Sequence, residues 1–292
     1  MTGLAPIDGI AVFAIFAKAM GYGAALLAMG GVMFIFFFAS RATRDILRLA
    51  QRIAVGAALF GLVVLALRFG IRAARISGMG LQGATDPIML GFVWDSPLGT
   101  AAIWRGLGEA AILALLLPSI GRWIALIGSV AVAISFTQVG HTLGDPRILL
   151  AAPLTFHLLA VALWVGALLP LRQASRSPKG ADLLHHFGLI AAYAVGLLMA
   201  AGVALSWLLS GSLSALFGTA YGWALLTKLA LVTGLLGVAA LNKWRLVPAL
   251  RAGDPKAAPA LRRSISVEIT VVVLILLVTA AITSVTTPPV NL

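Results

Sequence analysis

Residues 140–170, GHTLGDPRILLAAPLTFHLLAVALWVGALLP, join a short polar turn to a long apolar run. Because about 20 apolar residues are enough for a helix to cross a bilayer, the run predicts a membrane-spanning helix. His141 lies in the turn and His157 lies in the run. Helical spacing places His157, Val161 and Trp164 on one face, so the histidine and the tryptophan can meet the same neighbour. A buried imidazole needs a partner, and neutral imidazole is the commonest metal ligand.

The composition of the whole chain indicates an integral membrane protein. Of its 292 residues, 61% are apolar and 10% are charged, whereas a soluble domain is about 25% charged. The apolar residues form blocks separated by proline and glycine. We therefore predict an all-α polytopic bundle of about eight transmembrane helices, with residues 1–292 forming a single transmembrane domain. The expected spans are 10–38, 49–71, 97–117, 121–139, 149–171, 184–209, 221–242 and 265–286.

Basic residues are unequally distributed between the two sets of loops. The net charge of +12 would suggest nucleic acid in a soluble chain, but here the charge lies in short loops, where membrane orientation and lipid headgroups explain it better. We expect a lipid bilayer and no nucleic acid as partner, cytoplasmic odd-numbered loops, and both termini outside. The odd loops contain residues 41–52, 122, 172–179 and 243–263, whereas Arg68, Arg72, Arg75 and Arg147 lie toward the other side.

The chain has no cysteines, which excludes disulfides, thiolate metal sites and catalytic thiols. A transition metal would therefore need His, Met, carboxylate, water or backbone oxygen ligands. The sequence also lacks a zinc-protease, nucleophile-elbow or phosphate-loop motif, so we expect no enzymatic activity. Of the four histidines, His185 and His186 are adjacent. They point in different directions from a helix and are expected at the inner interface.

Several charged residues fall inside the predicted spans, where they are costly and usually face a partner or a cavity. Arg105 and Glu109 are four residues apart and can pair on one helix face. They are compatible with a self-neutralised structural pair or with the lining of a conduction path. Lys228 is compatible with either helix association or contact with anions or water in a cavity. Glu268 is expected to pair with Asn242, Lys243 or the basic loop near the inner interface.

The outer side is expected to hold His141, Met79, Met89 and Asp145, with His157 about two turns deeper. Imidazole suits both copper states, and methionine sulfur suits Cu(I). Each residue also has an ordinary interpretation. The buried histidine is compatible with a bond to a nearby carbonyl or hydroxyl, the loop histidine with a surface position, and the methionines with packing over the bundle mouth. Lys18 and Arg68 are less informative, because long side chains near a span end can reach the interface.

Six segments follow one another in a specific order along the last two thirds of the chain: Gly140-His141, His157 to Pro170, Gly218 to Lys228, Ala239 to Pro248, Leu261 to Glu268 and Pro288-Pro289. With these segments the sequence resembles the CopD family of bacterial copper-resistance and copper-transport proteins over about residues 97–289. The resemblance implies an eight-helix bundle in the inner membrane that binds or passes copper, often supplied by a periplasmic CopC-type chaperone. It also implies metal-site positions at His141 and His157, and structural or path positions at Trp164, Lys228 and Glu268.

Together, these features favour a multi-pass transporter that takes up a copper ion at its outer mouth. In this hypothesis His141 captures copper, with Met79, Met89 or Asp145 as further ligands, and His157 receives it inside the bundle, where Glu109 offers negative charge. Two alternatives remain open from the sequence. One is a membrane oxidoreductase or haem-binding bundle, and the other is a receptor for a periplasmic copper chaperone that transports nothing.

Overall fold

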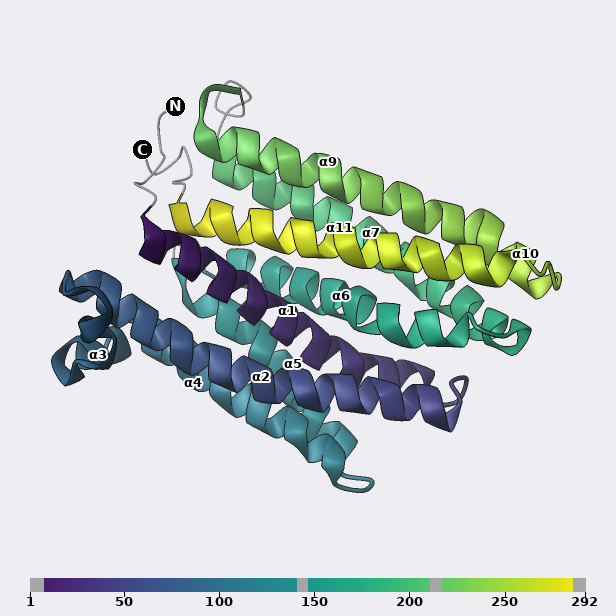
Figure 1. Cartoon of the computed structure of the whole chain (residues 1–292), viewed down its shortest axis with the longest axis horizontal. Coiled ribbons are helices and arrows are strands. Elements are labelled where there is room, and N and C mark those ends of the chain that lie inside the picture. Colours follow the sequence, from purple (N-terminus) through teal and green to yellow (C-terminus); the bar gives the residue numbers. More distant parts are fainter. Residues whose placement is uncertain (1–7, 141–146, 211–216, 286–292) are drawn as a thin grey trace.

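The computed structural model describes residues 8–140, 147–210 and 217–285, and these residues fold almost entirely into helices (Figure 1). Eight helices within them are long and apolar enough to cross a membrane, which confirms the predicted all-α bundle. They are α1 (Gly9–Phe38), α2 (Arg44–Ser77), α4 (Pro97–Ile112), α5 (Gly121–Ser135), α6 (Arg147–Ala174), α7 (Ala181–Ser210), α9 (Ala220–Leu241) and α11 (Ala257–Val285).

Shorter helical segments extend or connect these spans. The turns η2 (Leu113–Leu116) and η3 (Phe136–Gln138) extend α4 and α5, and η5 (Pro178–Gly180) precedes α7. The π-helical turn η6 (Asn242–Leu246) carries α9 directly into α10 (Val247–Arg251). The connection between α2 and α4, which we expected as a loop, contains η1 (Gly80–Thr85) and α3 (Pro87–Trp94).

The helix boundaries differ from the predicted spans chiefly where charged residues flank an apolar block. Helix α2 starts five residues before the predicted position 49 and continues to Ser77, so it includes both Arg44 and Arg75. It ends where Gly78 adopts a left-handed conformation with φ of 67°, which glycine adopts without steric cost. Arginine is a good helix former, so a change in polarity does not end the helix.

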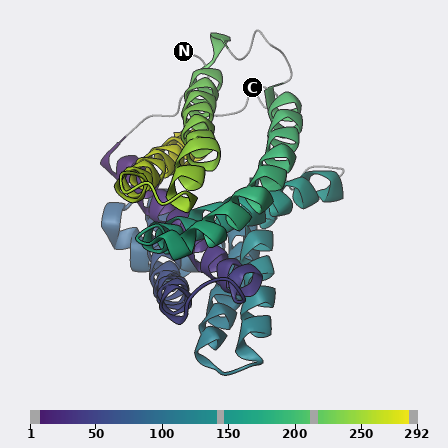
Figure 2. The same ribbon diagram turned by 90° about the vertical axis from the view of Figure 1, so that its right-hand side faces the viewer.

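Helix α1 lies at the centre of the bundle and packs against α2, α5, α6 and α11. Figures 1 and 2 show it between α2 and α6. At its crossing with α6, a Cβ placed on Gly30 would lie 1.9 Å from the carbonyl oxygen of Ala162, and one on Gly166 would lie 2.3 Å from the Gly30 carbonyl carbon. Only hydrogen fits at these two positions, so the glycines permit direct backbone contact between the helices.

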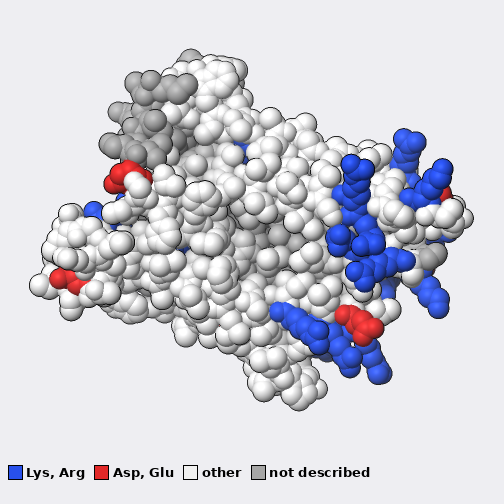
Figure 3. Space-filling model, viewed as in Figure 1, with Lys and Arg blue, Asp and Glu red and all other residues white. Residues whose placement is uncertain are grey.

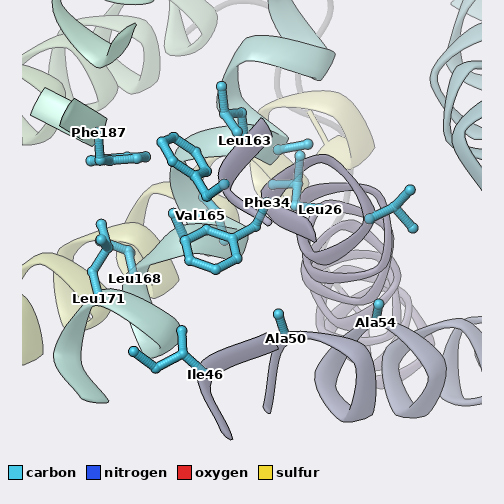
Figure 4. Packing of buried hydrophobic residues seen from close by; sticks show 14 of the residues in the cluster. Leu26, Phe34, Ile46, Ala50, Ala54, Leu163, Val165, Leu168, Leu171 and Phe187 are labelled. Atoms are coloured by element: carbon cyan, nitrogen blue, oxygen red, sulfur yellow. The ribbon is translucent and has the colours of Figure 1, made fainter. Parts of the chain in front are cut away.

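The largest apolar core surrounds this crossing (Figure 4). Phe34 of α1 is fully buried near Val165 and Leu168 of α6, and Ala50 and Ala54 of α2 pack against α1 at the neighbouring Gly31. A second, small cluster of Tyr221, Leu225 and Ile282 joins α9 to α11. Helix α9 is thus attached to the bundle mainly through α11.

Lysines and arginines gather at one end of the bundle (Figure 3). That end contains the α1–α2 turn, the connection between α6 and α7, and α10 (Figure 1). The odd-numbered connections therefore share one basic end, as expected for helices that alternate in direction. The opposite end carries α3 and the beginning of α1.

Candidate functional site

His157 lies in α6 and offers an unused nitrogen. Its Nδ1 is buried and has no hydrogen-bond partner within the described part of the chain. Pro153, about one turn earlier, removes one backbone hydrogen bond from the helix because proline has no N–H. Lys228 of α9 is close enough for its charge to act on the imidazole. The side chain is therefore a half-buried imidazole near a positive charge, with one nitrogen unpaired among the described residues.

Two of the predicted outer ligands cannot be compared with His157. His141 and Asp145 both lie outside the described residues. The other two, Met79 and Met89, lie on either side of η1 in the connection between α2 and α4. Met79 is half-exposed, and the backbone N–H of Met89 donates to the Asp86 carboxylate, which caps α3 at 2.9 Å. The Asp86 carboxylate is thus engaged in capping α3.

No group of three or more His, Asp or Glu side chains that could hold a metal ion occurs among residues 8–140, 147–210 and 217–285. A fully protein-built site of such ligands is therefore absent from these ranges. Within these ranges, the His157 imidazole is therefore not part of a cluster of three or more such side chains.

Glu268 of α11 is a second buried polar centre, and it joins three elements. Trp164 Nε1 of α6 donates to its Oε2 at 3.2 Å, and Asn242 Nδ2, at the start of η6, donates to its Oε1. Asn242 is one of the three partners that the sequence suggested for Glu268. The hydrogen bond between Trp164 and Glu268 was not predicted. These two residues are 104 positions apart in the sequence and meet only because α6 packs on α11.

The electrostatics of this centre are unusual for a buried carboxylate. Glu268 is 4% exposed, and the two groups that bond to it, an indole and an amide, are neutral. Asn242 Oδ1 is also buried and lacks a partner among the described residues. A carboxylate charge without a positive neighbour is costly in an apolar interior unless a cation or a proton joins it. The centre thus has the donors and acceptors to hold either one.

Arg105 and Glu109 of α4 form the ion pair that their spacing predicts, with Arg105 Nε 2.6 Å from Glu109 Oε1. Arg105 also donates to the carbonyl of Gly21 at 2.7 Å, and its guanidinium lies 4.6 Å from the centre of the Phe136 ring. Glu109 is fully buried against Gly61 of α2, where any Cβ would collide with its carboxylate. The pair thereby connects α4 to α1, α2 and η3.

A polar cluster that was not predicted from the sequence lies near the end of the bundle opposite the basic one. Lys18 Nζ of α1 donates to the carbonyl of Thr283 at 2.6 Å, and the Tyr22 hydroxyl lies 3.2 Å from Thr283 Oγ1. Arg68 of α2 packs against Gly21 of α1, which lies between the lysine and the tyrosine in the sequence. The periodic polar spacing of Lys18 and Tyr22 along α1 was the available signal, but their partner lies 265 and 261 residues away.

The fold and its eight long apolar helices in the described ranges define a multi-pass helical membrane protein with polar groups buried between its helices. Two family models match the chain: "Copper resistance protein D-like, N-terminal domain" over residues 8–146 and "Copper resistance protein D" over residues 181–282. The chain belongs to the copper resistance protein D family. The N-terminal match also includes the first two spans, in which we recognised no family motif.

Two curated proteins are similar to the chain. Copper transport protein CutJ of Bacillus subtilis (strain 168) is 27% identical over 93% of this chain and 52% of its own length. Inner membrane protein YebZ of Escherichia coli (strain K12) is 27% identical over 73% of this chain and 75% of its own length. The chain thus spans about half the length of CutJ. No solved structure matches it.

Proposed function

We propose that the chain carries copper ions across the bacterial inner membrane and so contributes to copper resistance or homeostasis. The single observation that carries this proposal is the buried Nδ1 of His157, which has no hydrogen-bond partner among the described residues, in a family of copper-handling membrane proteins. The name of CutJ, a copper transport protein, and that of YebZ, an inner membrane protein, support the activity and the membrane. Copper is the cargo, and its oxidation state is left to the experiment.

Two histidines pass the ion in this proposal. His141 captures copper at the outer mouth, with Met79, Met89 or Asp145 as additional ligands, and His157 receives it inside the bundle. Imidazole binds both Cu(I) and Cu(II), while the few further donors keep binding weak enough for release. The positive charge of Lys228 near His157 opposes a bound cation and so favours onward movement.

The remaining path leads toward the basic end. Glu268, held by Trp164 and Asn242, compensates the charge of the ion after it leaves His157. Arg105 and Glu109 neutralise each other and hold α4 against α1 and α2. The basic end faces the cytoplasm by the positive-inside rule, so both termini lie outside, where a CopC-type chaperone can deliver copper.

Copper flux into proteoliposomes tests the proposal. Purified wild-type protein and the variants His157→Ala, His141→Ala and His185→Ala are reconstituted, and uptake of Cu(I) and Cu(II) is followed beside the bound copper per chain. We expect both transport histidines to be needed for flux, and His157→Ala to lower the copper bound. His185 is exposed on α7, so His185→Ala is the matched control and retains wild-type flux.

Three outcomes contradict the proposal. Wild-type flux and stoichiometry in His157→Ala would remove this residue from the path. Copper or chaperone binding without flux by the wild type would indicate a receptor. Visible absorption from a bound cofactor in the purified protein would indicate an oxidoreductase or a haem-binding bundle instead.

A further inference from the structure

A cavity of about 540 Å³ lies at the basic end of the bundle, away from His157 and Glu268. It lies between the last turn of α1, the first turns of α2, η2 and the start of α5. It is lined by Ile35, Arg44, Leu47, Arg48, Gln51, Leu115, Leu117, Ser119 and Arg122. The copper path proposed above uses none of these residues.

The polar wall of the cavity is strongly positive. Three arginines line it, Arg44 and Arg48 from α2 and Arg122 from α5. The acidic residue nearest to them in the chain is Asp45, which is exposed and lies 3.8 Å from Arg48 at the surface, where such a pair contributes little. The carboxylate is not among the lining residues, so the cavity keeps a net positive charge.

Two helix N-termini add to this charge. Helices α2 and α5 both begin at the cavity, with Arg44 and Arg122 in their first turns. In the described structure, neither preceding residue, Thr43 or Ile120, caps its helix through a side chain. In α5 the Trp123 N–H donates to the Ile120 carbonyl at 3.0 Å, so its two preceding N–H groups and the first N–H groups of α2 are the ones without a side-chain cap. Together with the helix dipoles, these N–H groups favour an anion.

The shape of the cavity combines this polar mouth with an apolar floor. The arginines and Ser119 are exposed, whereas Ile35, Leu47 and Leu115 are buried or half-buried. Gln51 Nε2 donates to the carbonyl of Leu115 at 2.7 Å and fixes the junction between α2 and η2. Near the mouth, Trp123 stacks edge-on with Phe36, and exposed tryptophan is typical of the membrane–water interface.

We propose that this cavity binds the phosphate group of an anionic ligand, most simply the headgroup of an acidic phospholipid whose acyl chain covers the apolar floor. Guanidinium groups and helix N-termini are the donors that phosphate prefers in proteins, and basic pockets between transmembrane helices are suited to acidic lipids. A lipid bound here connects the α1–α2 turn to the α4–α5 turn. The proposal is independent of the copper site.

Native mass spectrometry of the delipidated full-length protein tests this site. Phosphatidylglycerol and phosphatidylcholine are titrated separately, and inorganic phosphate is added as a competitor. We expect phosphatidylglycerol to be retained in preference to phosphatidylcholine. The triple variant Arg44→Gln/Arg48→Gln/Arg122→Gln weakens its binding by about fivefold for each arginine removed.

Two further variants separate the cavity from the general charge of this end. Arg41→Gln/Arg52→Gln/Arg245→Gln removes the same charge from exposed positions that do not line the cavity, and it should bind like the wild type. Ser119→Asp keeps all arginines but places a carboxylate at the mouth. Ser119 has a positive φ of 53°, a conformation that aspartate tolerates better than most residues, so this variant should fold and lose phosphatidylglycerol.

The two sources of phosphate give different results. Arginine-dependent retention of phosphatidylglycerol supports a lipid headgroup. Arginine-dependent protection by inorganic phosphate against thermal unfolding, without a preference between the lipids, supports a soluble phosphate compound. Equal binding of both lipids by the wild type and both triple variants, with no effect of phosphate, overturns the proposal.

Discussion

Buried charges in this protein are held in two different ways. Glu109 has a cationic partner in Arg105, whereas the hydrogen-bond donors to Glu268 in the described part of the chain are the neutral Trp164 and Asn242. A paired charge is fixed by its partner, while a carboxylate with neutral donors can accept a cation without breaking an ion pair. In the proposed transport path, the first centre is therefore structural and the second accommodates the ion.

The structural role of Arg105 and Glu109 predicts a non-additive mutant cycle. Glu109→Leu alone leaves Arg105 buried without a counter-charge and should lower the free energy of unfolding by about 3–5 kcal/mol. The double variant Arg105→Met/Glu109→Leu removes both charges and should recover most of that loss. Thermal unfolding in detergent measures both. A stable double variant that has lost copper flux would instead place the pair on the conduction path.

Lys228 is predicted to weaken copper binding at His157. In Lys228→Met the positive charge is removed while most of the side-chain volume is kept, so copper should be retained more tightly and released more slowly. Lys228→Arg retains the charge and is the matched control. Equilibrium copper binding and proteoliposome flux are measured together. Unchanged affinity in Lys228→Met would mean that its charge does not reach the bound ion.

At the scale of elements, direct backbone contact determines how α1 crosses α6. A Cβ on Gly30 would lie 1.9 Å from Ala162 O, whereas one on Gly234 of α9 has no neighbour within 4 Å. We expect Gly30→Ala to destabilise the fold by about 1–3 kcal/mol or more through overpacking. Gly234→Ala gains about 1 kcal/mol of helix propensity instead. Equal unfolding temperatures for the two variants would contradict this crossing.

The elements also show which parts of the structure the sequence could predict. All eight spans follow from apolar length, because a bilayer sets that length directly. Apolar length does not predict that α2 extends to Ser77 or that α3 exists, because helix formation continues outside the apolar block. The Arg105–Glu109 pair was predictable because it lies within one helix. The hydrogen bonds of Glu268 to Trp164 and of Lys18 to Thr283 were not predictable, because they depend on how the helices pack.

The whole molecule has one strongly basic end, which predicts its orientation in the membrane. The chain has no cysteine, so single cysteines can be introduced without background. Two exposed residues are suited to replacement by cysteine: Leu81 in η1, which is 77% exposed, and Ala252, directly after α10. The variants are Leu81→Cys and Ala252→Cys. By the positive-inside rule, a membrane-impermeant maleimide should label position 81 in spheroplasts, and position 252 only after lysis. The reverse pattern would invert the proposed direction of the bundle.

Helix α9 has the smallest buried fraction of the eight spans found in the described ranges. It continues through a π-helical turn into α10, and it carries Lys228. Most of its surface therefore faces acyl chains, and little protein contact restrains its tilt. The distance between Lys228 and the imidazole of His157 should therefore depend partly on the thickness of the bilayer. If His157 receives copper as proposed, lipids of different chain length should change the copper affinity of one unchanged sequence.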